Sequence, residues 1–262
     1  MTAREVIELI RKNVGVPWNE NSYRDTFHVG NPDVEVKGIA TTCMSTLDLI
    51  QRAHDADTNL VISHEPTFWS DSDSTRDITE DPVYKFKSDY CLKNDIVVWR
   101  FHDHWHARKP DMEYFATARK LGFADPDATK SNNQTIYTVP PIKLSALVED
   151  VKRCMGSHAL RVVGDPNAMV SRVIVGEGSI MPRLSPDVDV VIGGEGVESD
   201  GPFDNTAYAR DAVSLGIAKG LIIMGHVISE EPGMEDAAKW LSTFIQSVPI
   251  RFIPAGEPFI SV

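Results

Sequence analysis

Three apolar runs in the chain each end in a histidine, and these runs constrain the fold more than any other feature. They read NLVISH, ending at His64, DIVVWRFH, ending at His102, and GLIIMGH, ending at His226. Each run is too apolar to have a solvated face, which is typical of a strand covered on both sides in a parallel sheet. Segments with helical spacing of apolar residues lie between the runs. This alternation predicts an α/β fold with mixed, largely parallel sheets.

The same alternation extends along the whole chain. Helices are predicted at 2–13, 45–56, 81–94, 111–121, 144–155, 205–215 and 234–245, and strands at 34–42, 60–63, 95–102, 160–164, 171–176, 188–194, 220–226 and 250–254. Ser45 is the expected N-cap of the second helix. A polar stretch at 124–133, followed by Pro140 and Pro141, predicts a boundary between one lobe at residues 1–125 and another at 140–262.

Composition excludes several classes of protein. The 262 residues carry a net charge of −12 without a Lys/Arg cluster, so a nucleic-acid partner is not expected. No apolar run approaches the length of a membrane span, so no membrane partner is expected either. The three cysteines are scattered and odd in number, which is typical of a reduced, cytoplasmic protein.

The three terminal histidines predict a metal site. In an open α/β sheet, ligands bind beyond the carboxyl ends of the strands, and parallel strands place those ends on one edge. A single histidine at such a position usually marks only the point where the strand reaches solvent. Three of them together favour a shared metal ion.

The sequence HDHWH after the second run offers more imidazoles. If the backbone stays extended, His102, His104 and His106 lie on one face. If it becomes helical, only His102 and His106 share a face. Those two are the predicted ligands under both alternatives.

Carboxylates adjoin the terminal histidines. Glu65 follows the first, while Glu230 and Glu231 come soon after the last. Imidazole combined with carboxylate suits Zn²⁺, Mn²⁺, Fe²⁺, Co²⁺ or Ni²⁺. No cysteine is near these residues in the sequence, which favours an open catalytic site over a closed thiolate site. Glu65 and Glu231 are the candidate catalytic proton carriers, because each adjoins a proposed ligand.

These motifs resemble those of the Nif-three-like (NGG-one-interacting factor three) family, also called dinuclear metal centre proteins. The segment NLVISHEPTFW is similar to the family's Leu-(Ile/Val)-(Ser/Thr)-His-His-Pro-x-Phe motif, and FHDHWH and GLIIMGHVISEE fall where the family has His-Thr-x-x-Asp and Gly-His-x-x-(Ser/Thr)-Glu. The early segment DTFHVGNPDVEVKGIATTC also resembles the family. When the neighbouring carboxylate of Glu65 is added to the residues that match these motifs, the expected metal ligands are His64, Glu65, His102, His106, His226 and Glu230.

The resemblance also implies an architecture. It implies two interlocked α/β lobes with the metal site in the cleft between them, and a homo-oligomer, usually a homohexamer. Glu65 stands where the family has a second histidine, and His106 where it has an aspartate that bridges two metals. One or two divalent ions per chain are therefore expected.

Two classes of function follow from the resemblance. The first is a metal-dependent hydrolase, of the kind named GTP cyclohydrolase 1 type 2 homolog, which uses metal-activated water on a nucleotide-like or small polar substrate. The alternative is a metal-binding scaffold or regulatory protein without catalysis. An unrelated amidohydrolase ranks last. In that class of enzyme the His-x-His pattern belongs on the first strand of a barrel, whereas in this chain it falls near residue 104.

Overall fold

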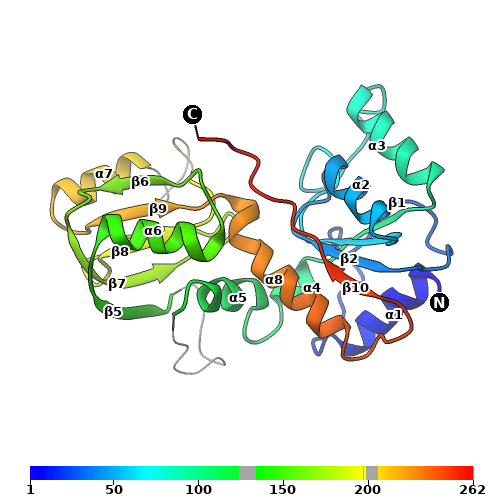
Figure 1. Ribbon diagram of the computed structural model, residues 1–262, viewed down its shortest axis with the longest axis horizontal. Helices are drawn as coiled ribbons and strands as arrows, with labels where there is room; N and C mark the ends of the chain where they lie inside the picture. Colours follow the sequence, from blue (N-terminus) through cyan, green and yellow to red (C-terminus); the bar gives the residue numbers. More distant parts are fainter. Residues whose placement is uncertain (124–133, 197, 199–205, 262) are drawn as a thin grey trace. The chain divides into compact units, whose positions relative to one another are not determined.

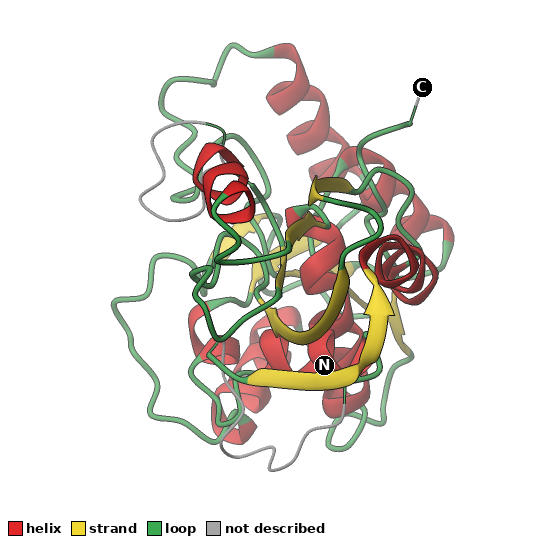
Figure 2. Cartoon of the chain, turned by 90° about the vertical axis from the view of Figure 1, so that its left-hand side faces the viewer, coloured by secondary structure: helices red, strands yellow, loops and turns green. Residues whose placement is uncertain are grey.

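The computed structural model describes residues 1–123, 134–196, 198 and 206–261, and it divides into two compact units. The first unit comprises residues 1–109 and 234–255, and the second comprises residues 110–233 and 256–262. Each unit contains a five-stranded mixed sheet and helices (Figure 1). Figure 2 shows the same elements by type, with helices in red and strands in yellow. The expected linker at 124–133 lies outside the described residues.

The sheet of the first unit has the strand order β1-β4-β3-β2-β10. Its strands are β1 (Phe27–Val29), β2 (Ile39–Thr42), β3 (Leu60–Ser63), β4 (Val97–Arg100) and β10 (Ile250–Phe252). The four strands from β4 to β10 are parallel, whereas β1 pairs antiparallel with β4 at the edge. Every residue of β2, β3 and β4 is buried, which explains why these strands show no alternation of apolar and polar residues.

The helices of the first unit begin where the sequence supplies caps. They are α1 (Ala3–Asn13), α2 (Leu47–Asp55), α3 (Pro82–Lys93) and α4 (Asp103–His106), together with the part of α8 (His226–Leu241) from residue 234 onward. A capping box of Thr2 and Glu5 starts α1. The expected cap of α2 was wrong, because the Thr46 side chain accepts from Leu49 N, whereas the buried Ser45 hydroxyl donates to Thr67 Oγ1 at 3.2 Å.

The sheet of the second unit has the order β5-β7-β8-β9-β6. Its strands are β5 (Ile136–Lys143), β6 (Arg161–Gly164), β7 (Met169–Val175), β8 (Val190–Gly193) and β9 (Gly220–Ile223). The three central strands are parallel, and both edge strands pair antiparallel. Pro140 and Pro141, expected in a boundary, lie inside β5, where the register shifts between Thr138 and Ile142. An edge strand tolerates proline because it needs fewer ladder donors.

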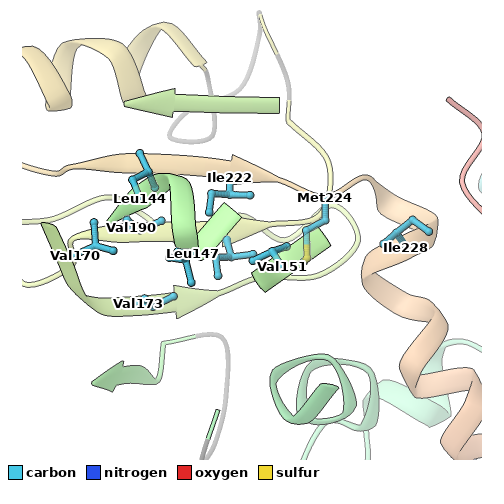
Figure 3. Packing of buried hydrophobic residues seen from close by; sticks show 10 residues of the cluster. Leu144, Leu147, Val151, Val170, Val173, Val190, Ile222, Met224 and Ile228 are labelled. Atoms are coloured by element: carbon cyan, nitrogen blue, oxygen red, sulfur yellow. The ribbon is translucent and has the colours of Figure 1, made fainter. Parts of the chain in front are cut away.

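One face of this second sheet packs against α6. The helices of the unit are α5 (Met112–Lys120), α6 (Leu144–Met155), α7 (Thr206–Ser214) and the first part of α8. The α6 side chains Leu144, Leu147 and Val151 belong to one buried cluster with Val173 and Ile222 of the sheet (Figure 3). Among the described residues, no helix is both long and apolar enough to cross a membrane.

Two histidine-ended strands are shorter than predicted. β4 ends at Arg100 and β9 at Ile223, and His226 is instead the first residue of α8. Gly225 has φ +97°, a conformation that ends the extended strand before the helix begins. Pro232 lies inside α8, although proline in a helix interior usually signals a boundary, and this explains why the helix was expected only from Met234.

A buried carboxylate ties three strands of the second unit together. Asp189, directly before β8, accepts from the backbone N–H groups of Ser171 and Arg172 at 2.8 and 3.0 Å, and lies 3.1 Å from Lys219 Nζ. Burial of the carboxyl raises its pKa, but these hydrogen bonds outweigh burial and hold the pKa below its usual range. The ionised carboxylate therefore stabilises the fold above a pH of about 4.

We expect Asp189→Asn to lower the free energy of unfolding by about 1.5–3 kcal/mol at pH 7, the scale for hydrogen bonds to a charged group. The difference from wild type should shrink as pH falls below about 4, because the native carboxylate then loses its advantage. Urea unfolding at pH 7 and pH 3 measures both effects. Asp33→Asn, which removes an exposed partner of Arg4, is the control and should change little. Equal unfolding midpoints for the two variants at pH 7 would contradict this role of Asp189.

Candidate metal centre

His64 lies at the carboxyl end of β3 and is completely buried. Its backbone N–H donates to Thr42 O at 3.0 Å, which continues the pairing of β3 with β2. On the ring, Nδ1 is 3.1 Å from Phe101 O, and Nε2 is 3.1 Å from His106 Nε2. Because a carbonyl oxygen can only accept, Nδ1 carries the proton, and the lone pair of Nε2 faces the neighbouring imidazole.

The segment HDHWH turns helical directly after β4. α4 covers Asp103–His106, so the helical alternative is the correct one, and His102 and His106 lie on one side. Their ring centroids are 4.7 Å apart, and those of His64 and His102 are 4.5 Å apart. The three imidazoles each offer a ligand atom within 4.8 Å of the others, a spacing that could hold one metal ion.

The middle histidine of this segment has a different role. His104 Nε2 accepts from Asn19 N at 2.7 Å, and its Nδ1–H donates to Asp25. The indole of Trp18 stacks on the imidazole with a centroid distance of 3.6 Å. Both ring nitrogens are therefore engaged away from the other three imidazoles.

Asp25 is the residue that sequence reasoning missed. Its carboxylate accepts from the backbone N–H groups of His102, Asp103 and His104, at 2.5, 3.1 and 3.0 Å. It is 8% exposed, so few waters can replace these donors. One side chain thus fixes the turn that presents two of the clustered imidazoles. The one feature of the sequence that could have indicated a role for Asp25 is the resemblance of its segment, DTFHVG, to the family's early Asp-containing motif.

Two of the clustered imidazoles, His64 and His102, are held in their neutral form. Burial lowers the pKa of His64 well below its usual range, and the nearby His102 and His106 lower it further. Burial, followed by His106, also lowers the pKa of His102. Asp103 Oδ1 is 3.0 Å from His102 Nδ1, so that proton is held on the side away from Nε2. Neutral rings with Nδ1–H bonded to an oxygen are the form in which histidine ligates metals.

Glu65 borders the imidazoles. Its Oε1 lies 3.6 Å from His102 Nε2, and its Oε2 lies 3.5 Å from the Arg100 guanidinium. Arg100 is completely buried, and its Nε donates to the His64 carbonyl at 2.9 Å. Its Nη2 also donates to Asp71 Oδ1 at 2.9 Å. The buried guanidinium therefore holds the His64 backbone and balances the charge of Glu65.

A second His/carboxylate group lies in the second unit. His226 and Glu230 are one turn apart on α8, with His226 Nε2 3.2 Å from Glu230 Oε2. His226 Nδ1 is 2.6 Å from Glu195 Oε2, so this imidazole also has its Nδ1 bonded to an oxygen. Glu230 is 3% exposed. The predicted ligands thus occur as His64, Glu65, His102 and His106 in one unit, and His226 and Glu230 in the other.

Glycine allows the backbone to approach this second group closely. Gly178 has φ +51°, and its N–H donates to Ser229 Oγ at 2.8 Å. A Cβ at this position would lie 1.9 Å from Glu230 Oε1 and 3.2 Å from His226 Nε2. Gly178 is therefore explained by its close packing against the His226–Glu230 pair.

The other candidate proton carrier is engaged elsewhere. Glu231 Oε1 accepts from Gly256 N at 2.7 Å, so its carboxylate holds the C-terminal segment of the second unit. Glu65 is therefore the better candidate for a proton carrier.

The comparison with protein families decides where this chain belongs. Residues 1–258 match the Duf34/NIF3 (NGG1p interacting factor 3) family. The chain is a member of this family. The match covers nearly the whole sequence, so the resemblance inferred from the motifs is confirmed.

Two relatives share the name GTP cyclohydrolase 1 type 2 homolog. The Clostridium perfringens protein is 20% identical over 269 aligned positions, covering 98% of this chain and 97% of the relative. The Clostridium acetobutylicum protein is 23% identical over 236 positions, covering 85% and 83%.

Solved structures show the same NIF3 fold. A Bacillus cereus protein related to NIF3 matches with a TM-score of 0.75 at 15% identity, covering 100% of this chain and 99% of the other. A Staphylococcus aureus hypothetical protein matches at 0.71 and 18%, with the same coverage. HcgD from Methanocaldococcus jannaschii matches at 0.61 and 21%, covering 95% and 97%.

The residues present fit a divalent transition ion. In the first unit, three imidazoles lie beside a carboxylate, and each of His64 and His102 has its Nδ1 bonded to an oxygen. In the described part of the chain, no cysteine belongs to any group that could hold a metal. This donor set suits zinc, manganese, iron, cobalt or nickel and lacks the thiolates of a closed structural site.

Asp25→Asn should weaken metal binding about 10–100-fold, the usual scale for losing a residue that orients ligands. The amide keeps the shape of the carboxylate but cannot accept from all the N–H groups of the turn, so His102 and His106 lose their fixed placement. Competition between the protein and a zinc-sensitive dye measures the affinity.

Asp189→Asn is the matched control, because it removes another buried, backbone-bonded carboxylate in the other unit. It should lower stability and leave zinc affinity unchanged. If both variants bind zinc as wild type does, Asp25 has only a structural role.

Proposed function

We propose that this protein is a metal-dependent hydrolase acting on a nucleotide-like or other small polar substrate. The main support is the group of His64, His102 and His106, whose imidazoles lie within ligand distance of one another beside Glu65. When bound, a divalent ion at such a group supplies a Lewis acid and lowers the pKa of water.

The chain's own residues supply orientation and proton transfer in this proposal. Asp25 and the carbonyl of Phe101 orient the imidazoles, and Arg100 holds the backbone of His64. Glu65 takes the proton from the attacking water, because its carboxylate lies at the edge of the imidazole group. Burial of these side chains excludes bulk water, which strengthens each electrostatic contact.

The substrate class rests on relatives. Two of them are named GTP cyclohydrolase 1 type 2 homolog, which supports a purine nucleotide or a similar ring as the first compound to test. At 20% and 23% identity these names identify a class to test and no particular substrate.

His226 and Glu230 are proposed to take part in the same function. The motif GLIIMGHVISEE and the engagement of His226 Nδ1 by Glu195 support a metal-ligating role for this pair. Their membership in one centre with His64 stays a prediction from the family resemblance. One or two ions per chain are compatible with these two donor groups.

We also propose that the protein self-associates as a homohexamer, on the basis of the family resemblance. Closed symmetric assemblies are the usual form of soluble oligomers. Light scattering at micromolar concentration tests this, and a monomer would contradict it.

His64→Ala and His106→Ala should each lower the bound metal at least several-fold after dialysis against metal-free buffer, because each removes an imidazole that must ligate. His226→Ala tests in the same way whether the second pair contributes. Elemental analysis per chain is the measurement.

His54→Ala is the control, since His54 is exposed on α2 and should not affect metal content. Full metal content in both His64→Ala and His106→Ala would place the site elsewhere.

Glu65→Gln should lower turnover roughly a hundredfold or more while metal content holds, if Glu65 carries the proton. The amide keeps the shape of the side chain and removes the base. Turnover of GTP and a panel of nucleotides and cyclic amides, with metal content measured in parallel, distinguishes the roles.

A parallel fall in metal content and activity would make Glu65 a ligand. If metal-loaded wild type hydrolyses nothing in the panel, while metal removal dissociates the oligomer, a metal-binding scaffold replaces the enzyme.

A further inference from the structure

We propose that a cavity beside α3 in the first unit binds a small aromatic carboxylate, with the ammonium group of Lys87 as the anion's partner. The cavity has a volume of about 290 Å³ and lies between the start of α3 and the segment that follows Glu65. Its lining is mostly apolar: Phe68, Trp69, Ile78, Val83 and Tyr84, with Thr67, Asp81 and Lys87 as the polar members.

Aromatic surface is available in this cavity. The rings of Phe68 and Tyr84 meet edge to face, with centroids 4.9 Å apart. Trp69 is 81% exposed and Val83 is 66% exposed, an unusual placement for large apolar side chains that line the same hollow. A flat aromatic ligand would cover surface that the chain itself leaves in water.

Lys87 supplies a positive charge to this apolar lining. Its side chain is buried, its ammonium donates to the Thr67 carbonyl, and it lies 5.4 Å from the centroid of the Phe68 ring. An ammonium has three donors, and within the described residues that carbonyl is its one oxygen acceptor at hydrogen-bond distance. A buried cation with so few acceptors is costly unless a ligand provides another.

The neighbouring acidic groups do not neutralise this ammonium by direct contact. Asp73 accepts from the N–H groups of Thr67 and Phe68 at 2.8 and 2.7 Å and lies 2.9 Å from His28 Nδ1. Asp81 caps α3 by accepting from Val83 N and Tyr84 N. Burial raises the pKa of the Cys91 thiol to about 11, so it is uncharged near neutral pH.

Burial also lowers the pKa of Lys87 to about 8, despite the opposing influence of Cys91 and Asp73. The ammonium is therefore present at pH 7 but only weakly favoured. An anion bound against it would favour the charged form, which is the linkage expected of a ligand site.

The size and chemistry of the cavity select the ligand class. A volume of about 290 Å³ is near the lower limit for small-molecule sites, about 300 Å³, so one or two fused rings are the largest fit. The aromatic lining favours a flat apolar body, and the single cation favours one anionic oxygen group. An aromatic carboxylate combines both features.

Isothermal titration calorimetry with 2-naphthoate and with its neutral analogue 2-naphthalenemethanol tests this proposal. At pH 7 we expect saturable binding of both, with naphthoate tighter. Lys87→Met should weaken naphthoate roughly tenfold or more, the scale of a charge-assisted hydrogen bond, and leave the alcohol unchanged. Naphthoate affinity should also fall in wild type as pH rises through about 8, because Lys87 then loses its charge.

Two controls locate the site. Lys85→Met removes a half-exposed lysine on the same helix that pairs with Glu80, and it should not change naphthoate binding. His64→Ala should not change it either, which separates this cavity from the proposed metal site. Trp69→Ala should weaken both ligands and serves as the test variant if Lys87→Met does not fold by circular dichroism. The proposal is overturned if wild type shows no saturable binding of naphthoate, or if Lys87→Met and Lys85→Met bind it equally. It is also overturned if Trp69→Ala binds both ligands as wild type does, or if His64→Ala abolishes naphthoate binding.

Discussion

The carboxylate of Asp25 accepts hydrogen bonds from three consecutive backbone N–H groups, those of His102, Asp103 and His104, and the histidine cluster depends on this interaction. The helix that follows β4 has only four residues, and the N–H groups of its first two residues, Asp103 and His104, bond to this carboxylate. The turn places His102 and His106 on the same side, where they meet His64. The His104 ring, bonded to the same carboxylate and stacked on Trp18, fastens the turn from its other side.

The parallel sheet provides the second half of this arrangement. β3 and β4 are paired in register, so their carboxyl ends lie side by side, and the residues that follow them are brought together. Arg100, the last residue of β4, is completely buried. Its guanidinium donates to the His64 carbonyl and forms ion pairs with Glu65 and Asp71. A buried cation is tolerated there since each of these contacts supplies an oxygen acceptor. The same contacts position one imidazole and one carboxylate of the candidate site.

Much of this fold was predictable from local patterns, because strands buried on both faces and capped helices leave clear signatures in the sequence. The capping box at Thr2 and Glu5 and the apolar run ending at Ser63 are examples. Asp25 was not predictable in this way, since its partners lie almost 80 residues further along the chain and meet it only after folding. Strand β5 and the first turns of α8 were also not predicted, because local propensity disfavours the prolines they contain, although an edge strand and a packed helix tolerate them.

In the proposed site, the Nε2 atoms of His64, His102 and His106 ligate one divalent ion. X-ray absorption spectroscopy of protein loaded with one equivalent of zinc tests this most directly. We expect a first shell of nitrogen and oxygen at about 2.0–2.1 Å with outer-shell scattering from several imidazoles, and a loss of part of that scattering in His106→Ala. A sulfur shell near 2.3 Å, or a spectrum that His106→Ala leaves unchanged, would contradict it.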